Sequence, residues 1–421
     1  MSTNAANSSL PISNRGPLHD LLVLDFTTHL SGPLTTQLLA GLGATVVKIE
    51  EPKGDPVRGF PPFVGATGHP TMVPDDAQSM SLPILNRARG KHSITLNLKA
   101  PESASVYAEL VRRADIVVEN YSSGTADRLG VGYEATRAIN PRIIYCSISG
   151  FGSGVTGRKA LDIVIQALSG IALASGVEGG EPVRVGLPVA DAITPLFAIM
   201  GILAAVHRRH VTGDGEYVDT SMLGALSAFM AIEDWHALAS MGPTRAGNTA
   251  IGRAPFGIYR CTDGHVAIAG GLRDKFVHAL FRAIGMPHLI DDDRYATAAA
   301  RSQRTNEVNS IVEGWTAKHS KEEAEHLLHE AGIPVAPVRS PMEALNDAQL
   351  AARGEVTSVT HPDFGTIPGL KTIGIPVRLH HAECGFGAPA PHLGQHNTAI
   401  YCEWLGIPHD QIAAWAKDGV V

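Results

Sequence analysis

Cysteine is scarce in this chain, which has four cysteines among its 421 residues. These four, Cys146, Cys261, Cys384 and Cys402, are far apart and form no CxxC pair. Their spacing argues against a zinc ribbon and a disulfide framework, so we expect reduced thiols in a cytoplasmic protein without bound metal. No segment resembles a signal peptide, and the longest apolar run, residues 193–206, is expected to be too short to span a membrane.

Positive charge is not in excess either. The chain has 34 lysines and arginines against 41 aspartates and glutamates, a formal net charge of -7. A protein that binds nucleic acid phosphates usually has the opposite balance, so we expect no nucleic acid and no membrane partner. The 44% hydrophobic content is that of a globular protein, and the length favours two domains.

The glycine fingerprint GxGxxG is missing from the first strand–loop–helix unit. A buried strand at residues 21–26 is followed by the loop 27–32 and by a helix that starts near Pro33. Such a loop can hold a phosphate or carboxylate through backbone N–H groups and the helix dipole. With a single glycine it cannot approach a pyrophosphate closely, which disfavours an NAD-dependent oxidoreductase. A plain turn between strand and helix remains the alternative.

Strand-like and helix-like segments alternate through the first 150 residues. The expected strands are residues 21–26, 45–50, 94–98, 114–120 and 142–149. Helices between them make βαβ units, which predict a doubly wound parallel sheet with ligands at the carboxyl ends of the strands.

The pattern changes after about residue 219, where helices come to dominate. Two short strands are expected within residues 256–269, on either side of a turn at Thr262–Gly264. The predicted domains are a large α/β domain at 1–222, a linker at 223–250, a small α+β domain at 251–332, and a returning segment at 333–421.

Asp191 is the most informative single residue. It ends a stretch punctuated by glycine and proline, residues 180–191, and stands just before the apolar run 193–206. A lone carboxylate among apolar residues is costly to bury unless something satisfies or uses it. An N-cap of the following helix is the commoner explanation, and a catalytic carboxylate is the alternative.

Polar side chains after the strand at 114–120 form a candidate nucleotide site. Asn120, Tyr121 and Arg128 combine an amide, a planar aromatic ring and a guanidinium, which can stack on adenine and hold a phosphate. Lys99 could reach the same phosphate. A surface loop with solvated cations is the alternative interpretation.

A second basic group lies in a glycine-rich loop. Arg158 and Lys159 precede Asp162, and a basic pair there suits a carboxylate or pyrophosphate ligand. The alternative is again a solvated pair. Gly270 and Gly271, after the strand at 266–269, could form a mobile lid or a simple turn.

Eight stretches together resemble the class III CoA-transferase family, typified by formyl-CoA transferase and carnitine CoA-transferase. They are LLVLDFTTHLSGP, GLGATVVKIEEPKGDPVR, KHSITLNLKAPE, ADIVVENYSSGTADRLG, NPRIIYCSISGFG, ALDIVIQALSG, GLPVADAITPLFAIMGILAAVHRRHVTGDGEYVD and IPVAPVRSPMEAL. Their order and spacing cover essentially the whole chain. The resemblance implies a large Rossmann-like α/β domain built from both chain ends, a small α+β domain, and two chains interlinked like rings.

The resemblance also assigns roles by motif position. Asp191 matches the catalytic aspartate of the family. Positions that contact coenzyme A are matched by His29, Leu30 and Ser31 in the thioester loop and by Leu96, Lys99, Asn120, Tyr121 and Arg128 around the nucleotide. To these predicted CoA contacts we add Arg158 and Lys159, because of their charge. Gly270 and Gly271 match a shortened lid, and Glu51 stands where the family often carries a basic residue.

The implied reaction moves CoA from an acyl-CoA to a free carboxylic acid, with coenzyme A as part of the substrate and no tightly bound cofactor. Arg158 and Lys159 favour a second carboxylate on the substrate, so we expect succinyl-CoA as donor and a small dicarboxylic acid as acceptor. A homodimer is expected, and pairing with a different subunit remains open.

An α-methylacyl-CoA racemase, from the same superfamily, is the alternative function. Racemases carry a histidine just before the aspartate that Asp162 matches, whereas Leu161 stands there in this chain. No histidine occurs between His92 and His207, so the racemase base is missing at its usual place. Asp162 is then a secondary active-site carboxylate or a helix cap.

Overall fold

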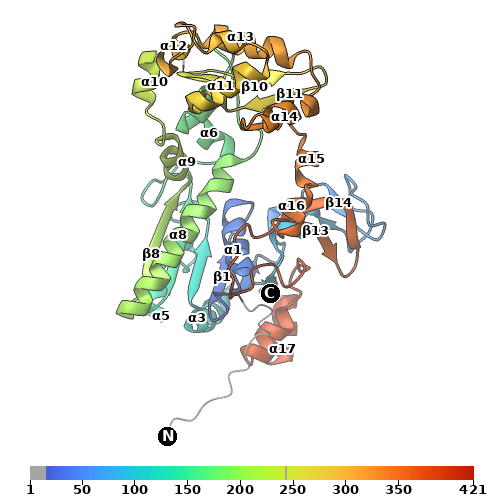
Figure 1. Ribbon diagram of the computed structural model, residues 1–421. Helices are drawn as coiled ribbons and strands as arrows, with labels where there is room; N and C mark the ends of the chain where they lie inside the picture. Colours follow the sequence, from blue (N-terminus) through green and yellow to red (C-terminus); the bar gives the residue numbers. More distant parts are fainter. Residues whose placement is uncertain (1–15, 242–243) are drawn as a thin grey trace. The chain divides into compact units, whose positions relative to one another are not determined.

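The computed structural model describes residues 16–241 and 244–421, which divide into two compact units. Unit 1 consists of Met1–Ile165, Leu187–Leu226 and Leu345–Val421, described from Gly16 onward. Unit 2 consists of Gln166–Gly186 and Ser227–Ala344. Figure 1 traces the chain through both units.

Unit 1 is built on a six-stranded sheet with the order β5-β2-β1-β6-β7-β8, in which every neighbouring pair is parallel. The strands are β1 Leu22–Phe26, β2 Thr45–Glu50, β5 Lys91–Thr95, β6 Ile116–Glu119, β7 Ile144–Ser149 and β8 Glu216–Ser221. The chain adds strands outward from β1 in one direction and then, from β6, in the other. The switch point therefore lies between β1 and β6, and ligands of doubly wound sheets bind at the carboxyl ends beside it.

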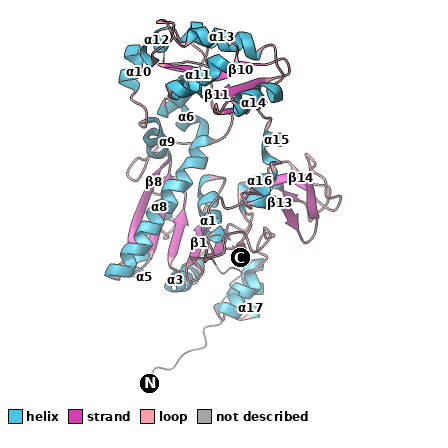
Figure 2. Cartoon of the chain, viewed as in Figure 1, coloured by secondary structure: helices cyan, strands magenta, loops and turns pink. Residues whose placement is uncertain are grey.

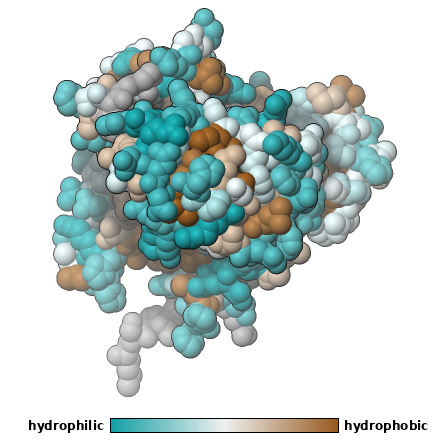
Figure 3. Space-filling model, turned by 45° about the horizontal axis from the view of Figure 1, so that its top comes forward, coloured by the Kyte–Doolittle hydropathy of each residue, from teal (hydrophilic) through white to brown (hydrophobic). Residues whose placement is uncertain are grey.

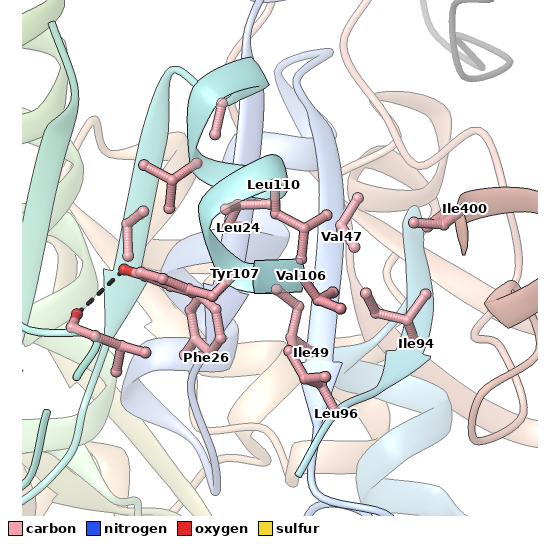
Figure 4. Close-up of a cluster of buried hydrophobic side chains, with 14 of the residues drawn as sticks. Leu24, Phe26, Val47, Ile49, Ile94, Leu96, Val106, Tyr107, Leu110 and Ile400 are labelled. Atoms are coloured by element: carbon pink, nitrogen blue, oxygen red, sulfur yellow. Dashed lines mark hydrogen bonds between the residues drawn. The ribbon is translucent and has the colours of Figure 1, made fainter. Parts of the chain in front are cut away.

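Hydrophobic cores cover both faces of this sheet, because alternate strand residues point to opposite sides. On one face, α1 (Ser31–Gly41) and α8 (Val189–Thr212) pack on the strands through Leu39, Ala198 and Ile202. On the other face lies α3 (Ser103–Arg113). Figure 4 shows this second core, with Val106, Tyr107 and Leu110 of α3 among Leu24, Val47, Ile49 and Ile94 of the strands.

The C-terminal segment completes unit 1. Tyr401 and Val421 lie in the same core as α3, and Asn97 N–H donates to the Val420 carbonyl at 2.7 Å. A hairpin of β13 (Val356–His361) and β14 (Gly365–Ile373) precedes this segment. The large unit is therefore made from both ends of the chain.

Unit 2 carries a four-stranded antiparallel sheet with helices packed on it. The sheet order is β12-β11-β10-β9, formed by Val335–Pro337, His265–Ile268, Arg253–Arg260 and Thr249–Ala250. The turn at Thr262–Gly264 joins β10 to β11, with Cys261 N–H donating to the Gly264 carbonyl at 2.8 Å. Helices α11 (Asp274–Ala283), α13 (Thr305–Thr316) and α14 (Lys321–Glu330) complete the core, giving the expected small α+β arrangement.

The remaining elements are short or connect these layers. They are η1 Pro56–Gly59, β3 Phe63–Val64, β4 Met80–Ser81, α2 Leu82–Arg87, α4 Thr125–Arg128, α5 Tyr133–Ile139, α6 Asp162–Ser169, α7 Ile171–Ala174, α9 Met222–Met230, α10 Trp235–Met241, η2 Gly270–Leu272, η3 Pro287–Leu289, α12 Ala298–Gln303, α15 Pro341–Leu345, α16 Ala348–Ala352, the π-helix Thr398–Trp404 and α17 His409–Lys417. Figure 2 shows how helices and strands are distributed along the chain.

The structure corrects three expectations about elements. β5 starts at Lys91 and not at residue 94, because buried polar contacts of Lys91 and Ser93 replace the apolar pattern. β8 was not expected, because its residues alternate and are mostly half-buried at the sheet edge. Helix α8 has 24 residues and is long and apolar enough to cross a membrane, so the expected length limit is wrong.

Length and composition do not make α8 a membrane span, because a core helix passes the same test. Ala198, Ile202 and Ala205 on one side of α8 are buried against the sheet. Its other side exposes Leu196, Met200 and Leu203. On the face drawn in Figure 3, hydrophobic side chains form small, separate groups among hydrophilic ones.

Candidate active site

The loop between β1 and α1 lies at the switch point of the sheet and is held from three sides. His29 has φ 66°, a left-handed backbone conformation that residues other than glycine rarely adopt. Its N–H donates to Asp55 Oδ1 at 3.3 Å, and its carbonyl accepts from Arg87 Nη1 at 2.9 Å. Such strained backbone persists only where its surroundings hold it, and it clusters at functional sites.

Asn120 fastens the same loop from across the switch point. Its Oδ1 accepts from Thr28 N–H at 2.9 Å, and its Nδ2 donates to the Thr28 carbonyl at 2.8 Å. The side-chain amide thereby pairs with both backbone groups of one residue. Asn120 positions the loop in this structure, a role that its place in the sequence did not reveal.

Ser31 opens α1 at the end of this loop. Its Oγ is buried, with the residue 3% exposed, and has no hydrogen-bond partner among the described residues. Leu30, at the N-cap position, supplies no side-chain cap to the helix. An unsatisfied buried hydroxyl at a helix N-terminus is a group that a polar ligand atom can pair with.

Charged residues buried inside the strands support the loop from below. Asp25 Oδ2 accepts from Lys91 Nζ at 2.9 Å, and Lys48 Nζ donates to the Thr27 carbonyl at 2.7 Å and to Asp55 Oδ2 at 3.1 Å. Burial by itself would raise the pKa of Asp25, but Lys91, Lys48 and two threonine hydroxyls lower that pKa to about 2. Burial lowers the pKa of Lys91 to about 8, against the opposing effect of Asp25.

Glu50 extends this network. Arg58 donates to both of its carboxylate oxygens at 2.7 Å, and Ser93 Oγ donates at 2.9 Å. Burial by itself would raise the pKa of Glu50, but Arg58, Lys48 and the Asp55 N–H lower that pKa to about 2. Sequence reasoning missed this network, although a signal was present: Asp25, Lys48 and Glu50 are charges placed inside or at the end of apolar strands.

Asp191 lies in the first turn of α8, and the N-cap position belongs to Pro188. The N-cap explanation of Asp191 is therefore wrong. Burial, followed by the nearby Asp162 carboxylate, raises the pKa of Asp191 to about 6, with Arg87 acting in the opposite direction. The carboxylate is thus destabilised in its charged form, which is typical of a reactive group.

Asp162, the first residue of α6, holds the backbone of Asp191. Its Oδ1 accepts from Ala190 N–H at 2.8 Å and from Asp191 N–H at 3.3 Å, at the start of α8. Asp162 was expected to be either a secondary active-site carboxylate or a helix cap. The structure shows that it caps a helix, and this helix is α8, not α6, to which Asp162 belongs. The same carboxylate is close enough to raise the pKa of Asp191.

Arg87 is the functional candidate that the sequence analysis missed. It ends α2, is partly buried, and donates to the His29 carbonyl. Burial lowers the pKa of Arg87, and the carboxylates of Asp55 and Asp191 oppose that shift. Arg87 therefore contacts the loop through a hydrogen bond and acts electrostatically on Asp191. The one signal in the sequence was the cluster of basic residues formed by Arg87, Arg89 and Lys91. Arg89 and Lys91 are themselves buried and take no part in these contacts with His29 and Asp191.

The predicted nucleotide contacts occupy different environments. Leu96 is 1% exposed and packs in the core, so only its backbone can face a ligand. Lys99 is an exposed side chain whose Nζ lies 3.4 Å from Glu51 Oε1, the position where the family often has a cation. Arg128 Nη2 donates to Thr125 Oγ1 at 2.7 Å on the exposed surface of α4.

Tyr121 lines a cavity of about 210 Å³ at the carboxyl ends of β6 and β7. Glu119 also lines it and accepts from Tyr121 N–H at 2.7 Å. Burial, with smaller effects from Asp127 and Asp219, raises the pKa of Glu119 to about 7. This buried carboxyl was not among the predicted site residues.

The other predicted residues are not brought into this cluster by any contact described above. Arg158 is exposed and lies over the Phe151 ring, 4.1 Å from its centroid, and Lys159 is exposed beside it. Gly270 and Gly271 belong to unit 2. There a Cβ on Gly271 would lie 2.9 Å from the Ala254 carbonyl carbon, so close packing accounts for that glycine.

Comparison with known proteins gives the family and agrees with the fold. The sequence pattern of CoA-transferase family III matches residues 18–397, and the chain belongs to this family. It is therefore an enzyme of the class III CoA-transferases, as the resemblance implied.

Individual relatives cover nearly the whole chain. It is 33% identical to a succinyl-CoA–D-citramalate CoA-transferase of Chloroflexus aurantiacus, over 94% of this chain and 96% of that protein. It is 34% identical to a formyl-CoA:oxalate CoA-transferase of Streptomyces avermitilis, over 96% and 99%. Its structure resembles that of a CaiB/BaiF family protein from Brucella suis, with a TM-score of 0.79 and 30% identity over 93% of this chain and 100% of the other.

Proposed function

We propose that this enzyme moves CoA from succinyl-CoA to a small dicarboxylic acid, with Asp191 as the nucleophile. The observation that carries the proposal is the pKa of about 6 at Asp191, a carboxylate in the first turn of α8 beside Arg87 and Asp162. At neutral pH most of it is ionised, and it is less stabilised than an ordinary surface carboxylate. The relatives named above transfer CoA between acids, and citramalate and oxalate are both dicarboxylates.

The first half of the reaction transfers the acyl group to the protein. An Asp191 carboxylate oxygen attacks the thioester carbonyl carbon, the C–S bond breaks, and CoA leaves as its thiolate. The product is a mixed anhydride of Asp191 and the donor acid. The thiolate then attacks the Asp191 carbonyl carbon, which releases the donor carboxylate and leaves an aspartyl-CoA thioester.

The second half reverses these steps with the acceptor. The acceptor carboxylate attacks the aspartyl thioester, expels the thiolate and forms a second mixed anhydride. The thiolate attacks the acceptor carbonyl carbon, so that the new acyl-CoA leaves and Asp191 is restored as a carboxylate. No proton, metal or oxidant is consumed, and CoA stays bound through the cycle by its distant nucleotide.

The loop from Thr27 to Ser31 supplies the positions for the thioester in this proposal. His29, Leu30 and Ser31 face it by motif position, and the Ser31 hydroxyl has no hydrogen-bond partner among the described residues. Asn120 and Arg87 keep the loop in one strained conformation before substrate arrives. Such preorganisation reduces the entropy that must be lost on the way to the transition state.

CoA would extend from this loop along the carboxyl edge of the sheet, toward the predicted contacts Leu96, Lys99, Asn120, Tyr121 and Arg128. The 210 Å³ cavity beside Tyr121 lies at that edge. Because Glu51 pairs with Lys99, we expect phosphate binding there to require that this exposed ion pair opens.

The Arg87 cation near Asp191 supports a dicarboxylic acceptor. Arg87 offers a guanidinium that already interacts with Asp191, and a second carboxylate on the substrate can pair with it. Arg158 and Lys159 remain a further candidate pair for that carboxylate. An acceptor with one carboxylate would leave the Arg87 charge without this partner.

We further propose a cytoplasmic homodimer. The exposed apolar side of α8 supports a partner surface, since Leu196, Met200 and Leu203 stand out from the unit 1 core. The four cysteines are free. Light scattering after gel filtration tests the dimer, and a monomeric mass would reject it.

Acyl exchange tests the function. Purified protein is mixed with succinyl-CoA and a panel of free mono- and dicarboxylic acids, and new CoA esters are identified by mass spectrometry. We expect a new dicarboxylyl-CoA with wild type and with Asp214→Asn, a matched exposed carboxylate just after α8, and none with Asp191→Ala. Turnover that persists in Asp191→Ala would reject the mechanism.

The same experiment separates the racemase alternative. A branched acyl-CoA is incubated with the protein in deuterated water, and α-proton exchange is followed. Exchange of that proton without any acyl transfer would replace the transferase proposal by the racemase. Transfer only to monocarboxylic acids would keep the mechanism and reject the dicarboxylate specificity.

A further inference from the structure

Two histidines and an aspartate meet at the edge of unit 1, outside the candidate active site. His361 ends β13, Asp363 lies in the turn before β14, and His392 comes from the loop that follows the hairpin. His392 Nε2 lies 2.7 Å and His361 Nδ1 3.7 Å from Asp363 Oδ2. One donor atom from each of the three residues lies within 4.8 Å of the others.

The His361 ring is oriented by its surroundings with one nitrogen toward the carboxylate. The residue is 3% exposed, and its Nε2 lies 3.0 Å from the Ala390 carbonyl, which can only accept a hydrogen bond. Its Nδ1 accepts from Asp363 N–H at 3.2 Å. The proton therefore sits on Nε2, and Nδ1 keeps its lone pair, which accepts from the Asp363 N–H until a metal ion displaces that hydrogen bond. A backbone carbonyl that fixes the histidine tautomer in this way is the usual outer partner of a metal-ligating histidine.

His392 is placed from the opposite side. Its backbone N–H donates to Gln395 Oε1 at 2.9 Å, which holds the loop next to the hairpin turn. The His361 and His392 rings stand nearly perpendicular, at 88°, with centroids 5.5 Å apart. Perpendicular rings that converge on one carboxylate can direct two nitrogen lone pairs at one point between them.

A cavity of about 200 Å³ adjoins the three side chains. His92 and His396 line it as well, with their rings 4.7 Å apart at 87°. The space exceeds what a single water molecule needs and is polar on several sides. An ion held by His361, Asp363 and His392 would thus have room for a water molecule as a further ligand.

Two of the three distances between ligand atoms are close to those of a tetrahedral site, and the two nitrogen atoms lie within 4.8 Å of each other. Metal–ligand bonds of about 2.0–2.1 Å place neighbouring ligand atoms about 3.3 Å apart. The contact at 2.7 Å must open and the contact at 3.7 Å must shorten by about half an ångström each to reach that value. Asp363 lies in an exposed turn, and this turn must also shift so that the Asp363 N–H releases the His361 Nδ1 lone pair.

We propose that His361 Nδ1, Asp363 Oδ2 and His392 Nε2 bind one divalent transition-metal ion of the Zn²⁺ class, with water in the fourth position. Two imidazoles and one carboxylate favour zinc or a neighbouring metal over magnesium or calcium, which prefer oxygen ligands alone. A solvated Asp363–His392 ion pair would not require the buried third side chain. The proposal is independent of the transferase chemistry.

The ion would fasten the hairpin turn to the loop before the C-terminal helices. That loop continues directly into contacts with the edge strand β5, where His396 N–H donates to the Ser93 carbonyl at 2.9 Å and Ser93 N–H donates to His396 Nδ1 at 3.0 Å. The ion would therefore have a structural effect, which is measured as a change in stability and in metal content.

Metal binding to the full-length protein tests the proposal. Chelator-treated protein is dialysed against Zn²⁺, separated from free ion, and analysed for metal per chain; Co²⁺ absorption reports the coordination geometry. We expect one Zn²⁺ per chain in wild type and at least tenfold weaker binding in His392→Ala and in Asp363→Asn. These sites are partly or fully exposed, so the variants are expected to fold, whereas His361→Asn is avoided because it alters a buried residue.

A matched control keeps the result specific. His326, on α14 in unit 2, also faces a carboxylate, with Nε2 3.9 Å from Glu330 Oε1, and it is exposed. His326→Ala should bind Zn²⁺ like wild type. Zn²⁺ should raise the thermal midpoint of wild type and His326→Ala by about 2 °C or more, and should leave His392→Ala unchanged. Wild type without bound zinc, or equal binding by wild type, His392→Ala and Asp363→Asn, would overturn the proposal.

Discussion

Unit 1 contains two kinds of carboxylate, whose pKa values are shifted in opposite directions. Asp25 and Glu50, inside the sheet, each meet a cation within 3 Å and have pKa values of about 2. Asp191, at the start of α8, has a raised pKa of about 6. All three are at least partly buried, so burial alone does not explain the difference.

The difference lies in what neutralises each charge. Lys91 and Arg58 contact Asp25 and Glu50 directly, whereas Arg87 acts on Asp191 against a second carboxylate, Asp162. A buried carboxylate with its own cation is stable and unreactive, and it can serve as scaffold. A buried carboxylate that shares its surroundings with another negative charge gains free energy when it forms a neutral bond to an acyl carbon.

The largest expected effect is on activity at the reactive carboxylate. Asp191→Asn removes the nucleophile at nearly constant volume, so acyl exchange should fall by about 10⁴-fold or more. Stability should stay the same or increase, because an unfavourable buried charge is removed. Steady-state kinetics and urea unfolding of the same preparation measure both. A loss of stability with full activity would reverse the roles assigned to the two groups.

The next effect is on stability at the paired carboxylate. Lys91→Met leaves Asp25 buried without its cation, and breaking a buried pair costs about 3–5 kcal/mol. Urea unfolding should show this loss, and the double variant Asp25→Asn/Lys91→Met should recover much of it. If Lys91→Met alone unfolds like wild type, the pair at 2.9 Å does not support the sheet as proposed.

A smaller effect is expected where the loop is clamped. Asn120→Ala leaves the N–H and carbonyl of Thr28 without their side-chain partner, at a cost of about 1–3 kcal/mol. Because the loop then loses its strained conformation, kcat/KM should fall by about 10–100-fold. Asn120→Asp, which retains an acceptor for the Thr28 N–H but no donor for its carbonyl, should give an intermediate value. Unchanged kinetics for Asn120→Ala would remove the clamp from the mechanism.

The smallest effect is a shift of the pH profile. The nucleophile must be ionised, so kcat/KM should rise tenfold per pH unit below about pH 6 and level off above it. Asp162→Asn removes a charge that raises the Asp191 pKa, so its profile should move to lower pH. Arg87→Met removes a charge that lowers this pKa, so its profile should move to higher pH.

Each of these pH shifts should be about one unit or less. They are measured on kcat/KM with succinyl-CoA between pH 4.5 and 8, in the range where the variants remain folded by circular dichroism. Shifts in the same direction for both variants would contradict the placement of Asp162 and Arg87 around Asp191.

Acidification also separates the two groups by stability. The folded-state pKa values of Asp25 and Glu50 lie below their ordinary values. At a pH between the folded and the unfolded pKa, the unfolded chain therefore binds more protons than the folded chain. The stabilisation from these pairs is therefore complete above about pH 4.5 and is lost as the pH falls toward 2.

Part of this arrangement could be predicted from local pattern. The apolar runs at 21–26 and 45–50 correspond to β1 and β2, and the family motifs led to the transferase class. β8 escaped prediction because an edge strand buries little on either side. Asp191 stood out as a lone carboxylate and Asp162 as a possible second carboxylate, whereas Arg87 did not stand out, because nothing in its local sequence differs from that of surface residues.

The sequence by itself determined the alternation of strands and helices in the first 150 residues and the membership of the family, since apolar periodicity and motif spacing are local properties of the chain. Only the tertiary structure decided which charges are paired. Asp25 meets Lys91 across 66 positions, Thr28 meets Asn120 across 92, and Asp162 meets Asp191 across 29. The strength of a charge interaction depends on distance and burial in space. The same residue type therefore became scaffold at one position and candidate nucleophile at another.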